Sequence, residues 1–221
     1  MIDGLDDLRN PNGERLDAVH TAAAPGVSSP AGPGALVVVA HGVTSHHDRP
    51  WLVALCDALS AAGVASVRFS FAGNGRSEGR FVDATISKEV DDLGAVLDLL
   101  VDRAGRRVAY AGHSMGGAVG TLRAADDDRV AAFLSLAGMV HVTRFVDRHF
   151  GDLVPGRDVM LGKPDCPLSR AFVDDARRIG DVLDAARRVR CPWRIVHGTA
   201  DEIVPFADAE AAVEASGGRA E

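Results

Sequence analysis

The stretch that decides the fold of this chain reads Gly112-His113-Ser114-Met115-Gly116-Gly117. It fits the pattern G-x-S-x-G and lies between an apolar run at 108–111 and a helix-like run at 118–127. So sharp a turn from strand to helix strains the serine backbone, needs small neighbours and exposes the hydroxyl group. The same residues also occur by chance as a glycine-rich turn. The strand before them, the helix after them and an acidic loop after a later strand favour Ser114 as a nucleophile.

The rest of the chain alternates apolar runs with amphipathic segments. We expect strands at 35–40, 65–71, 107–112, 130–136 and 192–197, and helices at 48–63, 87–105, 115–127, 172–189 and 205–216. The run at 35–40 is apolar throughout, as in a strand buried on both faces of a parallel sheet. Strands that alternate with helices predict βαβ units with right-handed crossovers. The predicted fold class is therefore α/β, with a doubly wound, mostly parallel sheet.

Two segments fall outside this alternation. Residues 1–34 predict a short N-terminal hairpin, with its turn at 10–13, and a loop rich in Pro, Gly and Ser at 25–34. Residues 139–174 hold three prolines and lack a clear period, which predicts an irregular insert. With 221 residues in all, we expect one domain at 1–221.

Composition and charge restrict the classes of function. The chain is 47% hydrophobic and 25% charged, which is typical of a soluble globular protein. Its net charge of −7 argues against nucleic acid and against an anionic membrane surface as partners, because both favour a basic face. The sequence has neither an apolar run near the roughly 18 residues of a membrane span nor a visible secretory signal. We expect a cytoplasmic protein without a membrane partner.

The cysteines and the glycine-rich loop give no sign of a cofactor. Cys56, Cys166 and Cys191 form no C-x-x-C pair, so zinc and redox motifs are not indicated. The loop at 73–79 fits neither of the phosphate-binding glycine patterns and indicates a structural turn. We therefore expect no cofactor and no metal.

Besides Ser114, the ends of two further strands carry distinctive residues, and sites in such sheets form at the carboxyl ends of the strands. At His41-Gly42-Val43, the glycine allows a turn that directs the Val43 N–H toward a substrate oxygen, beside the Met115 N–H. Two such donors form an oxyanion hole, and a plain strand-ending turn is the alternative. Asp201 follows the last strand, where a carboxylate orients a catalytic histidine. From position alone, Glu202 or a simple turn role for Asp201 fits equally well.

These motifs, in this order, resemble the α/β-hydrolases, in the branch of soluble esterases and serine aminopeptidases. The motifs that carry the resemblance are His41–Ser45, Ser70–Gly79, Gly112–Gly117 and His197–Asp201. The run 41–81 is most similar to cinnamoyl (feruloyl) esterases, and the resemblance covers roughly residues 35–221.

The resemblance implies a role for each candidate residue. Ser114 is then the nucleophile, Asp201 the acid, and the Val43 and Met115 amides the oxyanion hole, with 139–174 as a short cap over the acyl pocket. The implied activity is hydrolysis of a small-molecule carboxylic ester through an acyl-enzyme at Ser114, without a cofactor. A serine aminopeptidase or a thioesterase uses the same machinery, so the sequence leaves these substrates open.

The catalytic histidine of that family is missing. The family order is Ser, Asp, His, and no histidine follows Asp201 in this sequence. We expect a piece of a longer hydrolase that lacks the last strand and helix. The alternatives are a catalytically silent binding module on the same fold, or His141 or His149 as a substitute base. Without a further strand, 192–197 is a free sheet edge, and we expect a homodimer or aggregation through it.

Overall fold

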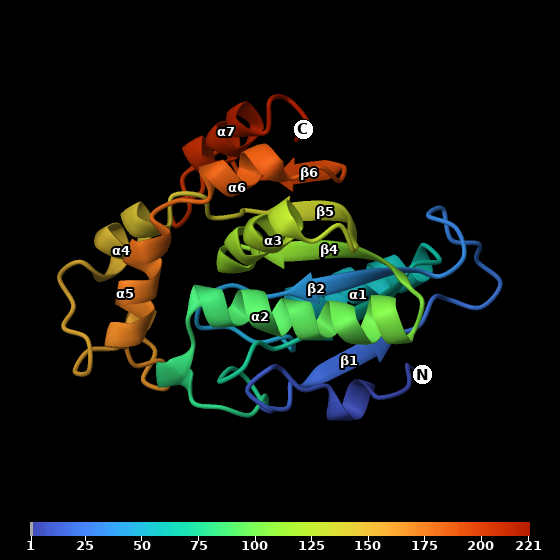
Figure 1. Ribbon diagram of the computed structural model, residues 1–221, viewed down its shortest axis with the longest axis horizontal. Helices are drawn as coiled ribbons and strands as arrows, with labels where there is room; N and C mark the ends of the chain where they lie inside the picture. Colours follow the sequence, from blue (N-terminus) through green and yellow to red (C-terminus); the bar gives the residue numbers. More distant parts are fainter. Residues whose placement is uncertain (1) are drawn as a thin grey trace.

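A six-stranded sheet forms the centre of the molecule, with the strand order β1-β3-β2-β4-β5-β6 (Figure 1). The computed structural model describes residues 2–221. The strands are β1 (Ala18–Thr21), β2 (Ala35–Ala40), β3 (Ala65–Phe69), β4 (Arg107–His113), β5 (Val130–Leu136) and β6 (Trp193–Val196). Only β1 is antiparallel to its neighbour, and the other four pairs are parallel. The predicted fold class is therefore confirmed.

Helices cover both faces of the sheet. They are α1 (Pro50–Ala61), α2 (Ile86–Leu97), α3 (Met115–Asp126), α4 (Val142–Phe150), α5 (Arg170–Ile179), α6 (Leu183–Arg188) and α7 (Phe206–Ala215). There are also short 3-10 helices η1 (Leu5–Asp7), η2 (Phe81–Asp83) and η4 (Met160–Gly162), and a π-helix η3 (Asp98–Arg103) that continues α2. In Figure 1, α2 and α3 lie in front of the sheet and α1 lies behind it. Helices α4 and α5 stand beyond the carboxyl ends of the parallel strands, at the left of the figure.

Strand β2 shows why the sheet is buried on both faces. Val38 belongs to the large core cluster, which includes residues of α2 and α3, whereas Val39 packs with Leu52 and Cys56 of α1. Side chains alternate between the faces of a strand, so a strand between two helical layers needs apolar residues at every position. The apolar run 35–40 meets that requirement.

The structure corrects two helix predictions. The helix predicted over 172–189 is two helices, because Gly180 adopts φ +73° after α5 and α6 begins only at Leu183. The segment 139–174 is not irregular throughout, since it contains α4. The buried residues of α4 include Val142, Phe145 and Val146, at the spacing of one helical face. Helix α1 also begins differently, with Arg49 rather than Asp48 at the N-cap.

The N-terminal segment forms less strand than the hairpin pattern predicts. The turn lies at 10–13, but a single antiparallel bridge between Arg9 and Arg15 closes it. Strand β1 pairs with β3 instead, from Ala18 opposite Phe69 to Thr21 opposite Ser66.

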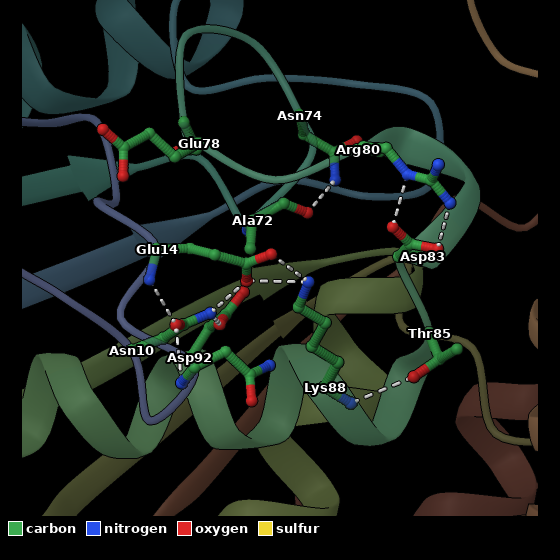
Figure 2. Close-up of polar contacts among 12 residues, drawn as sticks. Asn10, Glu14, Ala72, Asn74, Glu78, Arg80, Asp83, Thr85, Lys88 and Asp92 are labelled. Carbon is green, nitrogen blue, oxygen red and sulfur yellow. Dashed lines mark hydrogen bonds and ion pairs between the residues drawn. The ribbon is translucent and has the colours of Figure 1, made fainter.

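A network of buried polar groups joins the N-terminal segment, the chain after β3 and helix α2 (Figure 2). Asn10 Nδ2 donates to Asp92 Oδ1 and the Ala72 N–H donates to Asp92 Oδ2, both over 2.7 Å. Burial raises the pKa of Asp92 to about 6, although both of these hydrogen bonds act in the opposite direction. The network holds the chain where the loop 73–79 begins, in agreement with a structural role for that loop.

Glu89, on the same helix, is buried without a matching donor. It is 1% exposed, and its Oε2 has no hydrogen-bond partner among the described residues. Burial raises the pKa of Glu89 well above its ordinary value, and the carboxylates of Asp92 and Asp175 raise it further. The folded chain therefore keeps a proton on Glu89 at pH values where the unfolded chain has released it.

The free energy of unfolding should fall as the pH rises through the raised pKa of Glu89. The contribution of this proton to the free energy of unfolding is fully present below the ordinary pKa of 4.5, and it is lost as the pH rises through the folded-state pKa. Because Glu89→Gln stays neutral, its advantage over the wild type in the free energy of unfolding should grow as the pH rises from the ordinary pKa through the raised pKa of Glu89. Urea unfolding at several pH values measures this difference, with the exposed Glu214→Gln as control. A parallel decline of wild type and Glu89→Gln would contradict the expectation.

Strand β6 is the outer strand of the sheet within residues 2–221, and it is only partly covered. The Glu221 N–H donates to Trp193 O over 3.1 Å, and Glu221 O accepts from the Ile195 N–H over 2.8 Å. Val196 is 54% exposed. Beside the strand lies an apolar cavity of about 320 Å³, lined in part by Phe133 and Trp193. Apolar surface beside the edge of a sheet favours association between copies of a chain.

We therefore expect dimers that form through β6. A lysine at position 196 brings like charges together across a pairing edge, so Val196→Lys should shift the chain toward the monomer. Val27→Lys, at a valine that is 44% exposed in the 25–34 loop, is the matched control and should leave the dimer intact. Size-exclusion chromatography with light scattering measures both variants. A wild-type chain that stays monomeric would show that β6 is not a pairing edge.

Candidate active site

Ser114 sits at the turn between β4 and α3 with a strained backbone. Its dihedral angles are φ 52° and ψ −116°, outside the regions that a non-glycine residue ordinarily adopts. The Ser114 N–H donates to Leu136 O over 2.9 Å, and Ser114 O accepts from the Met139 N–H over 3.0 Å. These two hydrogen bonds join the turn to the end of β5 and the residues after it, and they hold Ser114 in this conformation. Strain held in this way is typical of functional sites.

Three glycines allow this turn to close. A Cβ at Gly112 would overlap the carbonyl group of Gly116, and a Cβ at Gly116 would lie 2.6 Å from His41 O. A Cβ at Gly42 would lie 2.9 Å from the Ser114 Cβ. The G-x-S-x-G spacing therefore has a steric cause here, and the chain after β2 passes directly against Ser114.

Two backbone N–H groups beside Ser114 are available to a ligand. The Val43 N–H has no acceptor among residues 2–221. Met115 is the first residue of α3, where N–H groups lack partners within the helix and where the helix dipole is positive. Because Gly42 packs on Ser114, both donors lie at the same strand ends as its hydroxyl group.

The segment between α4 and α5 reaches back over this loop. Lys163 Nζ donates to Thr44 O over 2.7 Å and to Thr44 Oγ1 over 2.9 Å. Thr44 has φ +56°, so its backbone is also strained. This contact holds Thr44, the residue next to Val43, in place. It joins residues 119 positions apart in the sequence, so no local pattern indicates it.

Asp201 forms a turn after β6. Its Oδ1 accepts the N–H groups of Ile203 and Val204 over 2.8 Å and 2.9 Å, which leaves Oδ2 without such a bond. Burial lowers the pKa of His113, the residue before Ser114, and the negative charge of Asp201 acts in the opposite direction. Glu202 is exposed and makes no side-chain contact of this kind within the described residues. The turn role of Asp201 is observed, and its role as the catalytic acid stays a proposal.

None of the described histidines is hydrogen-bonded to the Ser114 hydroxyl group. His41 is fully buried, with Nδ1 2.8 Å from Gly42 O and Nε2 accepting the Phe71 N–H over 3.2 Å. Burial lowers the pKa of His41 to about 3, so it is a neutral link between the ends of β2 and β3. His149 Nε2 lies 2.9 Å from Ile203 O.

His141 has a different set of partners, which the sequence did not indicate. Its Nδ1 lies 2.9 Å from Asp208 Oδ1, and Asp208 Oδ2 accepts the N–H groups of Val140 and His141. Asp208 lies on α7, 67 residues further along the chain, and only the tertiary fold brings the two together. A carboxylate on one ring nitrogen is the arrangement that orients a histidine.

The described residues form neither a candidate metal site nor a candidate membrane span. No group of three or more His, Cys, Asp or Glu side chains among residues 2–221 is placed to hold a metal ion. None of the helices described is both long and apolar enough to cross a membrane.

Known proteins are similar to this chain in sequence and in fold. A family model described as serine aminopeptidase, S33, matches residues 31–163. The mitochondrial palmitoyl-protein thioesterase ABHD10 of Rattus norvegicus is 26% identical in an alignment of 185 positions that covers 77% of this chain and 60% of that protein. The chain thus spans less than two thirds of the length of this relative. The rat protein is named as mitochondrial, whereas the cytoplasmic location inferred from the sequence stays a prediction.

Solved structures agree with this assignment. Est1E from Butyrivibrio proteoclasticus, with ferulic acid bound, has a TM-score of 0.76 at 27% identity over 92% of this chain and 83% of that chain. The esterase domain of a Rhodothermus marinus protein has a TM-score of 0.71 at 25% identity over 94% and 81%. Since the family model covers more than half of the residues, the chain belongs to the serine aminopeptidase S33 family of α/β-hydrolases.

Proposed function

We propose that this protein hydrolyses a carboxylic ester through an acyl-enzyme at Ser114. The observation that carries the proposal is the strained turn at Ser114, held by backbone bonds to β5 and by glycines that admit no Cβ. Similarity to a protein whose structure contains ferulic acid, and to one named as a thioesterase, supports acyl transfer as the reaction class.

In the proposed reaction, Ser114 Oγ attacks the ester carbonyl carbon and forms a tetrahedral intermediate. The N–H groups of Val43 and Met115 donate to its oxyanion, and each donor of this kind typically contributes about 10²–10³ in rate. The proton that Ser114 Oγ loses is transferred to the departing alkoxide, which leaves as the alcohol. Water then attacks the acyl-enzyme, which releases the carboxylic acid and restores the Ser114 hydroxyl group. Asp201 is the proposed acid. Its Oδ1 fixes the turn, and its Oδ2, which lies 3.8 Å from Nε2 of His197, is the oxygen that would orient a catalytic histidine.

A second candidate function is a catalytically silent module that binds the ester without cleaving it. The absence of a histidine on the Ser114 hydroxyl, among the residues that the structure describes, favours this reading. A serine without a base is a poor nucleophile near neutral pH.

Turnover measurements separate these functions. The folded chain, verified by circular dichroism, is assayed with p-nitrophenyl butyrate, an S-butyryl thioester and alanine p-nitroanilide. The proposal predicts turnover of the ester, with the thioester as the next best substrate and little cleavage of the anilide. Preferred cleavage of the anilide would indicate an aminopeptidase instead. Binding of the intact ester without turnover would indicate the silent module.

A further inference from the structure

A cavity between α4 and the chain that enters α7 is separate from the Ser114 turn. It has a volume of about 430 Å³, within the range of small-molecule pockets. Its lining is His141, Arg144, Phe145, Arg148, Ile203, Val204, Pro205, Ala207 and Asp208. The cavity therefore combines cationic side chains with an apolar surface.

Arg144 and Arg148 supply the charge of this cavity. They lie one helical turn apart on α4 and line the same space. Neither guanidinium has a carboxylate partner within 4 Å among residues 2–221. The nearest acidic group of the lining, Asp208, is already bound by His141 and by two backbone N–H groups. The positive charge of the arginine pair is thus not neutralised by the protein itself.

The remainder of the lining is apolar. Phe145 and Val204 are buried, whereas Ile203 is 50% exposed, which is unusual for so large an apolar side chain. A ligand with an apolar chain would cover Ile203, and a planar anionic group on that chain would match the fork of donors that arginine presents. An inorganic anion alone would leave the apolar part uncovered.

Backbone hydrogen bonds connect the lining of the cavity to the candidate site. Val204, in the lining, donates its N–H to Asp201. His141, also in the lining, lies two residues after Met139, whose N–H donates to Ser114 O. The lining of this cavity is therefore joined through hydrogen-bonded backbone segments to Ser114 and Asp201.

We propose that the cavity between α4 and α7 binds the carboxylate of an apolar acyl chain, through Arg144 and Arg148. This inference rests on the proposed function. The substrate is then an ester that carries a carboxylate in addition to its scissile ester bond. His141 and Asp208 hold the start of α4 against α7 and so fix the direction of the arginine pair.

Calorimetric binding of octanoate tests this assignment without any turnover. Octanoate should bind to the intact chain about 10-fold more tightly than octanamide, which has the same chain and no charge, and salt should reduce the difference. In the double variant Arg144→Gln/Arg148→Gln this preference should disappear. Arg170→Gln, at an exposed arginine on the neighbouring α5 that lines none of this cavity, should keep the preference.

Two results would overturn the assignment. One is equal affinity of the wild type for octanoate and octanamide, and the other is a preference for octanoate that survives in the folded double variant. Because octanoate contains no ester, these results do not depend on Ser114 chemistry. A chain that binds octanoate as described but hydrolyses no ester would retain this cavity as a carboxylate site and would contradict the proposed function alone.

Discussion

Replacing Ser114 with alanine should lower the rate of p-nitrophenyl butyrate hydrolysis by on the order of 10³-fold or more, because the acyl-enzyme can no longer form. The Ser114 side chain has no hydrogen bond within residues 2–221, so its removal should change the free energy of unfolding little. The comparison requires kcat for both proteins and circular dichroism of both. Ser28→Ala, at an exposed serine in the 25–34 loop, should retain the wild-type rate.

A Ser114→Ala variant that keeps the wild-type rate would remove Ser114 from the mechanism. Hydrolysis would then come from another nucleophile or from a contaminant. A variant that loses both activity and fold would point to a structural role for the serine in the strained turn.

The second large effect concerns stability. In Gly116→Ala the new methyl group would lie 2.6 Å from His41 O, a distance that requires the backbone of the turn to shift. Overpacking of this kind typically costs about 1–3 kcal/mol. For a chain of this size, each kcal/mol corresponds to roughly 2–4 °C in Tm.

The matched control for this effect is Gly198→Ala. A Cβ at Gly198 meets no atom within 4 Å, and its φ lies outside the left-handed region. Differential scanning calorimetry should show a clear fall in Tm for Gly116→Ala and little change for Gly198→Ala. Equal Tm values for the two variants would mean that the turn tolerates a side chain and that the steric account of the G-x-S-x-G spacing is wrong.

The sheet could be predicted from the sequence because its signals are local. An all-apolar run such as 35–40 indicates a strand buried on both faces, and the structure has β2 at those residues. The turn at Ser114 was also predictable, since Gly112 and Gly116 are needed at their positions for steric reasons.

The remaining features depend on contacts between distant residues. The pair His141–Asp208 and the contact of Lys163 with Thr44 join residues 67 and 119 positions apart, which no local pattern contains. Helix α4 is a different case. Its nine residues lie in a segment that holds three prolines and lacks a clear period over its whole length, so the sequence did not indicate a helix there.

Labelling with a fluorophosphonate probe tests most directly whether Ser114 is an activated nucleophile. The folded chain is incubated with the probe near neutral pH, and the modified peptide is identified by mass spectrometry. We expect one adduct, on Ser114, that is absent in Ser114→Ala. A folded chain that remains unlabelled at Ser114 would contradict the claim and would favour the silent binding module.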